Sequence, residues 1–259
     1  MRRNNLKKAI YLLTAGLIVS FGSSTPGLAD GGSDSDLRQG LPGRRISGGV
    51  RIEPSADSCF TNFDQSLVSV MPRTNLGLTA MSHPTLWFSL PETTGSKSVE
   101  FQLLTELDEL VYSTPIEMGD ASGVSEFQLP PAAPALAMDK NYKWRLSLAC
   151  NHGSQSPVLG LEGWIRRVNI STALADQIAA ASSEERVFLY GTAGLWQEQI
   201  TELMNLRRQN SGGDDLQQAW TALIASTGLM SEVSNDIVES MIPIEATASS
   251  TLPLYDGYR

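Results

Sequence analysis

The fold class is decided by the stretch YKWRLSLAC, which spans Tyr142 to Cys150. Apolar side chains occupy every second position of this stretch, and Lys143, Arg145 and Ser147 lie between them. A period of two is typical of a β-strand that has one buried face and one wet face. The stretch therefore predicts an antiparallel sheet that is solvated on one side.

The same alternation extends outward over residues 50–170. It is clearest at 99–103 and 126–129, and turn signals such as Glu92–Gly95 and Pro130–Ala132 separate the runs. Short alternating runs divided by turns are typical of a β-sandwich. We expect an immunoglobulin-like or fibronectin type III-like domain over residues 50–170, with a β-bulge near its end, where the alternation changes parity.

From Ser171 onwards the period rises to about 3.6, which indicates helices. Serines and threonines at 171–172 and 182–183 are expected N-caps, and Gly194 is expected in a turn between helices. The pattern Tyr190-x3-Gly194-x-Trp196 resembles the middle of a tetratricopeptide repeat. Only one such unit is legible, whereas a stable solenoid needs about three. The prediction is an α+β chain in which a helical hairpin with tetratricopeptide-like features, residues 171–229, packs on the sandwich.

The first residues have the composition of an export signal. Two arginines and two lysines within residues 1–8 precede the apolar run Ala9–Val19, and Gly27-Leu28-Ala29 supplies small residues for cleavage. A retained membrane anchor is the alternative, although eleven apolar residues are fewer than the roughly 20 that span a bilayer. The chain is accordingly divided into a signal peptide (1–29), a flexible linker (30–49), the sandwich (50–170), the helical region (171–229) and a mostly disordered tail (230–259).

Charge and composition exclude several classes of protein. The 259-residue chain has a net charge of −9, and cleavage after Ala29 would leave 15 positive and 28 negative side chains, a net −13. Nucleic-acid binding needs a clustered basic surface, so we expect no nucleic-acid partner. With the signal removed, no integral membrane span is expected either. The oligomeric state is left open.

Cys59 and Cys150 are the only cysteines. In an oxidising compartment they are expected to form a disulfide, which over a loop of this length stabilises by roughly 4–5 kcal/mol in the chain-entropy model. Two free buried thiols and a redox pair are the alternatives. Trp87 lies between the two cysteines, as in immunoglobulin domains, but the spacing differs from theirs.

The sequence contains few candidates for catalytic residues, and no cofactor or metal is expected. Established nucleophile, zinc and phosphate-loop motifs are absent from the sequence. His83 and His152 are interpreted as loop or turn residues. The acidic group Glu106, Asp108 and Glu109 resembles a set of glycosidase carboxylates, but its position at a predicted hairpin turn favours a solvated loop.

Arginine pairs and tryptophans are the candidates for partner contact or for a domain interface. Arginines bind carboxylates in a bidentate manner, so internal pairing with acidic groups competes with docking of an anionic partner, for which Arg207-Arg208 is a further pair. The candidate residues are Arg44, Arg45, Trp164, Arg166, Arg167 and Trp196.

Five ordered motifs resemble the cyanobacterial family called domain of unknown function 928. They are Gly40-Leu41-Pro42-Gly43-Arg44-Arg45, Pro84-Thr85-Leu86-Trp87-Phe88, Tyr142-x-Trp144, Gly163-Trp164-Ile165-Arg166-Arg167 and Tyr190-x3-Gly194-Leu195-Trp196. The resemblance covers roughly residues 40–229. It implies an exported protein, but neither an activity nor an active site.

The sequence therefore favours an exported, non-enzymatic binding or assembly protein of the cell envelope or the medium, with a protein partner. A cell-envelope hydrolase is the first alternative. It requires His83 or His152 to approach a serine and a carboxylate, or two acidic side chains to face each other across a cleft. A carbohydrate-binding module is the second, and it requires at least two exposed, coplanar tryptophans.

Overall fold

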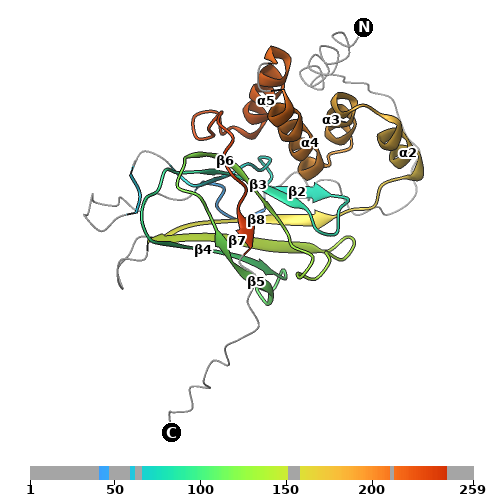
Figure 1. Cartoon of the computed structure of the whole chain (residues 1–259). Coiled ribbons are helices and arrows are strands. Elements are labelled where there is room, and N and C mark those ends of the chain that lie inside the picture. The colour runs from blue at the N-terminus through green and yellow to red at the C-terminus, as the bar shows by residue number, and fades with distance from the viewer. Residues whose placement is uncertain (1–40, 47–58, 62–65, 151–157, 211–212, 244–259) are drawn as a thin grey trace, which may run out of the picture.

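The computed structural model describes residues 41–46, 59–61, 66–150, 158–210 and 213–243. The predicted signal peptide, most of the predicted linker and His152 lie outside these ranges. Within them the chain is a mixed α+β fold in which strands dominate (Figure 1). None of the helices in the described ranges has the length and apolarity of a bilayer-crossing segment.

Two sheets carry the strands. The small sheet has the order β1-β3-β6, and the large sheet has the order β2-β8-β7-β4-β5-β9. The strands are β1 (Val68–Ser69), β2 (Leu76–Thr79), β3 (Thr85–Leu90), β4 (Lys97–Leu104), β5 (Leu110–Glu117), β6 (Gly123–Gln128), β7 (Asn141–Cys150), β8 (Val158–Arg167) and β9 (Ile242–Pro243).

The decisive stretch forms β7, in the middle of the large sheet. Trp144, Leu146, Leu148 and Cys150 are each at most 2% exposed, while the residues between them are half-buried. The predicted alternation is therefore confirmed at this strand. These side chains meet the small sheet, since the rings of Phe88 and Trp144 lie edge to face with centroids 5.5 Å apart.

Two details of the sheets differ from the prediction. The pairing is not wholly antiparallel, because β2 lies parallel to β8, with Leu76 opposite Trp164 and Thr79 opposite Arg167. The bulge expected near Arg166-Arg167 is not formed, since β8 pairs with β7 in unbroken register as far as Arg166. The change of parity in the sequence marks the end of β8. Likeness to immunoglobulin domains is not confirmed.

Four helices follow, α2 (Thr172–Ala180), α3 (Ser183–Thr192), α4 (Trp196–Gln209) and α5 (Asp214–Thr227). Ser171 caps α2, and Ser182 caps α3 in a capping box with Glu185. Gly194 and Gly228 supply the positive φ angles that the ends of α3 and α5 require. The described ranges thus contain four helices rather than one hairpin, and a tetratricopeptide-like arrangement is not confirmed.

The helices form a third layer against the outer face of the small sheet (Figure 1). β3 places Leu86 and Phe88 in the core between the sheets, while Trp87 faces the opposite way and packs with Ile200 and Trp220 of the helices. The period of two therefore makes the small sheet apolar on both faces. It is the shared wall between two hydrophobic cores.

The residues after α5 differ from the expected disordered tail. We call residues 234–243 the C-terminal strap. It runs parallel to β6, with bridges from Ile237 to Val124 and from Met241 to Phe127, and ends as β9 on the edge of β5. Residues 244–259 lie outside the described ranges.

Part of the predicted linker also forms backbone hydrogen bonds with the sheet region. The Leu41 backbone N–H donates to the Thr74 carbonyl at 2.8 Å, and Ile46 bridges to Val68 beside the small sheet. Composition rich in glycine and serine is thus compatible with an edge segment that the sheet orders.

Candidate functional site: a pocket between the helices and the small sheet

Cys59 and Cys150 form a disulfide that closes one end of the core, and the chain has no free thiol. Both residues are buried, and the Cys59 N–H donates to the Cys150 sulfur at 2.9 Å. The bond joins the end of β7 to a segment 91 residues earlier. The disulfide therefore cross-links two distant segments of the core.

Arg45, in the edge segment before β1, lies where the sheets meet the end of α5. Its guanidinium donates to the Thr227 carbonyl at 2.9 Å and to the Met71 carbonyl at 3.2 Å. Arg73 donates to the Ser226 carbonyl at 3.2 Å. Burial, with a contribution from the positive charge of Arg73, lowers the pKa of Arg45. Two arginines from the segments before and after β1 thus satisfy the last carbonyls of a helix, where cations are favoured.

Trp196 also lies at this interface. Its indole N–H, at the start of α4, donates to the Val70 carbonyl at 2.9 Å, and its ring packs against both cores. Trp87 makes the matching link from the sheet side, since its indole N–H donates to the Thr201 hydroxyl at 3.0 Å. Trp87 was not among the candidates, because the sequence alone does not tell which face of β3 the helices cover.

The remaining candidates lie elsewhere and are not brought together into one site. Trp164 is 7% exposed and donates to the Pro42 carbonyl at 2.7 Å. Arg166 donates to the Asn141 side chain at 2.6 Å, and Arg167 donates to the carbonyls of Ala80 and Leu136. Arg44 is exposed. The partners of Arg166 and Arg167 are neutral oxygens rather than the expected carboxylates.

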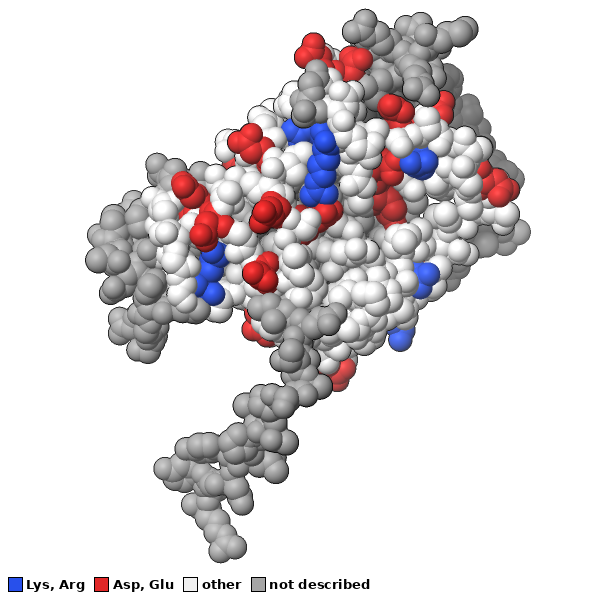
Figure 2. Space-filling model, viewed as in Figure 1, with Lys and Arg blue, Asp and Glu red and all other residues white. Residues whose placement is uncertain are grey.

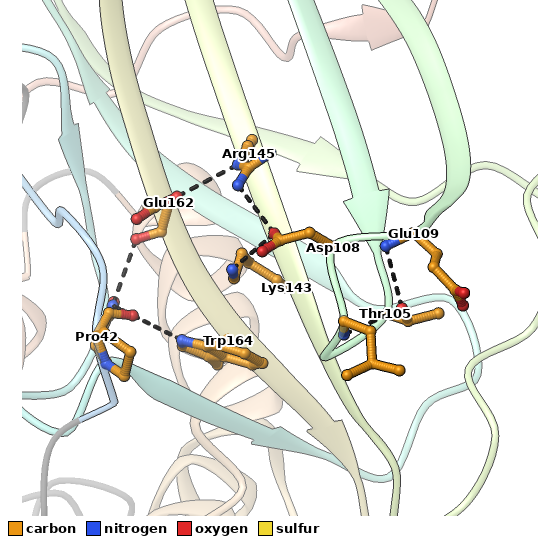
Figure 3. Close-up of polar contacts among 10 residues, drawn as sticks. Pro42, Thr105, Asp108, Glu109, Lys143, Arg145, Glu162 and Trp164 are labelled. Atoms are coloured by element: carbon orange, nitrogen blue, oxygen red, sulfur yellow. Dashed lines mark hydrogen bonds and ion pairs between the residues drawn. The ribbon is translucent and has the colours of Figure 1, made fainter.

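The acidic turn Glu106–Glu109 lies on the outer face of the large sheet (Figure 3). Asp108 accepts hydrogen bonds from Lys143 at 2.7 Å and from Arg145 at 2.9 Å, and Arg145 also pairs with Glu162 at 3.3 Å. The hydrogen bond from Lys143 lowers the pKa of Asp108. The turn is a solvated ion-pair ladder, and its carboxylates do not face each other across a cleft.

His83 does not complete a catalytic triad. Its Nε2 lies 3.0 Å from the Ala133 carbonyl, which can only accept a hydrogen bond, and its Nδ1 lies 3.1 Å from the neighbouring Ser82 hydroxyl. A carbonyl stands where a triad has a carboxylate. In the described ranges no three metal-ligating side chains come together either.

None of the five tryptophans is exposed: Trp87, Trp144, Trp164 and Trp220 are at most 7% exposed, and Trp196 is partly buried. The stacking platform expected for a carbohydrate-binding module is therefore not formed by tryptophans. Figure 2 shows that acidic side chains are spread over one face of the molecule and that the few basic ones lie among them.

A cleft of 630 Å³ lies between the strap, the C-terminal end of α4 and the beginning of α5. Arg207 and Arg208 are among the residues that line it. Arg207 donates to the Asn235 carbonyl at 2.8 Å and lies over the Trp220 ring, and burial lowers its pKa. Arg208 pairs with Glu126 of β6 at 2.7 Å. Arg207 thus holds the strap and Arg208 holds β6, so both arginines of the cleft already have partners within the chain.

A second hollow, which we call the α4 pocket, has a volume of 240 Å³. It lies where the start of β3 and the turn after β2 meet α3 and α4, and it combines acidic, aromatic and apolar side chains. Its lining is Thr79, Met81, His83, Pro84, Thr85, Gln128, Tyr190, Gln197, Glu198, Thr201 and Glu202.

Glu198 is the central polar residue of the α4 pocket. Its Oε1 accepts from the Thr79 hydroxyl and the Ala80 N–H, both at 2.7 Å, and from the Met81 N–H at 3.3 Å. Its Oε2 is buried and has no hydrogen-bond partner in the described part of the chain. One oxygen therefore holds the turn after β2, and no basic side chain in the described part of the chain forms an ion pair with this carboxylate.

Glu202 and Tyr190 complete the electrostatics of the pocket. Arg186 donates to Glu202 Oε1 through Nη2 at 2.6 Å and through Nε at 3.1 Å. Burial raises the pKa of Tyr190, and the negative charges of Glu202 and Glu198 raise it further. Counted over Glu198, Glu202 and Arg186, the pocket has a net charge of −1.

Sequence reasoning missed both glutamates. Their spacing of four residues does place them on one face of a helix. However, a glutamate pair on an amphipathic helix is the common pattern of a solvated face, and nothing local shows that β2 and β3 cover this one.

Comparison with known proteins gives a family but no function. No curated protein and no solved structure matches the chain. The resemblance inferred from the five sequence motifs is confirmed, because a family model described as Domain of Unknown Function (DUF928) matches residues 46–237, well over half of the chain. The five motifs follow the framework just described, from the edge segment before β1 to the start of α4. The chain therefore belongs to the DUF928 family.

Proposed function

We propose that this protein is an exported, non-enzymatic binding protein that holds a protein partner through the α4 pocket. Export is supported by the charged and apolar composition of residues 1–29. It is also supported by the disulfide between Cys59 and Cys150, since such bonds persist mainly in oxidising compartments.

The observation that carries the binding function is the α4 pocket itself. It is a concave site with converging polar groups, placed where two layers of the fold meet, which is where ligand sites commonly form. Its volume of 240 Å³ is below the roughly 300–1,000 Å³ of sites for drug-sized ligands. A pocket of this size suits one side chain of a larger partner.

The alternatives have less support from the same geometry. A hydrolase of the triad type needs a histidine oriented by a carboxylate, whereas His83 is oriented by the Ala133 carbonyl. A carbohydrate-binding module needs an exposed aromatic platform, and the tryptophans are buried or partly buried.

The test is capture of partners by the chain from residue 30 onward, immobilised and exposed to periplasmic extract or culture medium. Gln128 is exposed and lines the pocket, so Gln128→Trp obstructs it with little effect on the core. Gln218→Trp, on the exposed face of α5, is the matched control. We expect a partner that the native chain and Gln218→Trp retain and that Gln128→Trp loses. Equal capture by all three chains, or capture of nothing, rejects the proposal.

Export is tested separately by expressing the full chain in a Gram-negative host. We expect the protein in the periplasm or the medium, with its N-terminus at Asp30. A cytoplasmic protein that begins at residue 1 would show that residues 1–29 are not an export signal.

A further inference from the structure

The geometry of the α4 pocket points to a specific ligand chemistry, the primary ammonium group of a lysine side chain on the partner. This inference rests on the proposed binding function and names the group that the pocket receives. Three features of the pocket carry it: its net charge, the use of each carboxylate oxygen, and the mixture of apolar and aromatic walls.

The charge of the pocket favours a cation. Glu202 is paired with Arg186, but Glu198 has no cationic partner among the described residues, so one negative charge is left uncompensated. A buried carboxylate is stabilised by an opposite charge brought near it, because the surroundings screen the attraction less than bulk water does. An anionic or neutral group would leave this charge as it is.

The free oxygens favour an ammonium over a guanidinium. Arginine binds a carboxylate best through two parallel hydrogen bonds, which need both oxygens open. In Glu198, Oε1 already accepts three hydrogen bonds, and in Glu202, Oε1 accepts two from Arg186. Neither carboxylate offers a two-pronged site, whereas an ammonium is a compact point charge that a single oxygen can attract.

The walls of the pocket suit the aliphatic stem of lysine. Met81 and Pro84 supply apolar surface, and Met81 is 55% exposed, so its unbranched side chain can adapt to a ligand. The ring of Tyr190 adds an aromatic face, to which cations are attracted. A lysine entering from solvent would bury its methylene groups here and bring its charge towards Glu198.

The experiment measures binding of small probes to the ¹⁵N-labelled chain from residue 30 by NMR titration. The probes are the Nα-acetyl methylamides of lysine, arginine and norleucine, the last being the neutral analogue of lysine. We expect the lysine probe to shift resonances around the α4 pocket, to bind more tightly than the other two, and to weaken as salt is added.

Glu198→Gln is the decisive variant, because glutamine keeps the shape and an oxygen acceptor for the turn after β2. We expect it to weaken lysine binding on the order of tenfold. Asp176→Asn, on the exposed face of α2, removes one charge away from the pocket and should change nothing. Thermal denaturation of both variants shows whether the fold is retained.

Three results would overturn the inference: equal binding of norleucine, tighter binding of arginine, or unchanged lysine binding in Glu198→Gln. No shift with any probe would also reject it. The proposed function fails separately. A partner lost by Gln128→Trp but kept by Glu198→Gln would leave a binding protein whose ligand is not lysine. Lysine binding without any captured partner would leave a cation site without the proposed function.

Discussion

Gly163 shows how one residue sets the distance between strands and rings. A Cβ at this position would lie within 2.8 Å of Cε2 of Trp144, on the neighbouring strand β7. Trp144 is fully buried and packs edge to face on Phe88, so it has no room to move away. The glycine therefore determines how the two sheets meet.

Gly163→Ala is accordingly expected to destabilise the fold by about 1–3 kcal/mol, the usual range for overpacking a core. Gly160→Ala is the matched control on the same strand, since a Cβ there has no neighbour within 4 Å. Thermal or denaturant unfolding of the two variants measures the difference. Equal stability of the two variants would show that the core around Trp144 rearranges to accommodate the added methyl group.

Asp108 carries a prediction about pH. Its pKa is lowered mainly by the hydrogen bond from Lys143. Because the folded-state pKa is the lower one, this contact stabilises fully above the ordinary aspartate pKa and is lost as the pH falls through the folded-state value. In a carboxyl NMR titration, Lys143→Met should return the pKa of Asp108 towards its ordinary value. Lys97→Met, which removes a lysine paired with Asp120 instead, should leave it unchanged. A larger change in the pKa of Asp108 in Lys97→Met than in Lys143→Met would contradict the assignment of Lys143 as the main cause.

At the scale of helices and strands, some features follow from neighbouring residues, whereas others depend on pairing between distant parts of the chain. The alternation of β7 and the serine caps of α2 and α3 are local, and each could be predicted from a few neighbouring residues. The parallel pairing of β2 with β8 and the path of the strap depend on residues far apart in the chain. Glu198 belongs to the second group, because its role is set by the turn 118 residues before it.

Arg45 tests one such long-range link. Arg45→Ala removes the donor that holds the Thr227 carbonyl, and we expect a loss of stability of about 1–3 kcal/mol, as for hydrogen bonds from a charged group. Arg44→Ala, one residue earlier and exposed, should change stability by less than about 0.5 kcal/mol. Chemical denaturation of the two variants decides between a structural and a peripheral role for Arg45. A loss of stability in Arg45→Ala as small as that in Arg44→Ala would favour the peripheral role.

At the scale of the whole molecule, the three layers depend on one another. The small sheet gives Trp87 and Val124 to the core that the helices close, Val70 joins them from just after β1, and Trp87 is 2% exposed there. The strap, which follows α5 in sequence, returns to the sheets and places Met241 in the core between them. Each layer therefore buries apolar surface that belongs to another.

We predict that the chain unfolds as a single cooperative unit. If residues 30–170 and 171–259 are expressed separately, the first fragment loses the strap and exposes Trp87, and the second loses the wall on which its helices pack. We expect aggregation or poorly dispersed NMR spectra from each fragment, because a surface that large and apolar does not stay solvated in a monomer. The full chain should show one thermal transition followed by both near- and far-ultraviolet circular dichroism. Two soluble, folded fragments whose transitions match those of the full chain would instead establish two independent domains, and the short connection from Arg167 to Thr172 would then be a simple joint.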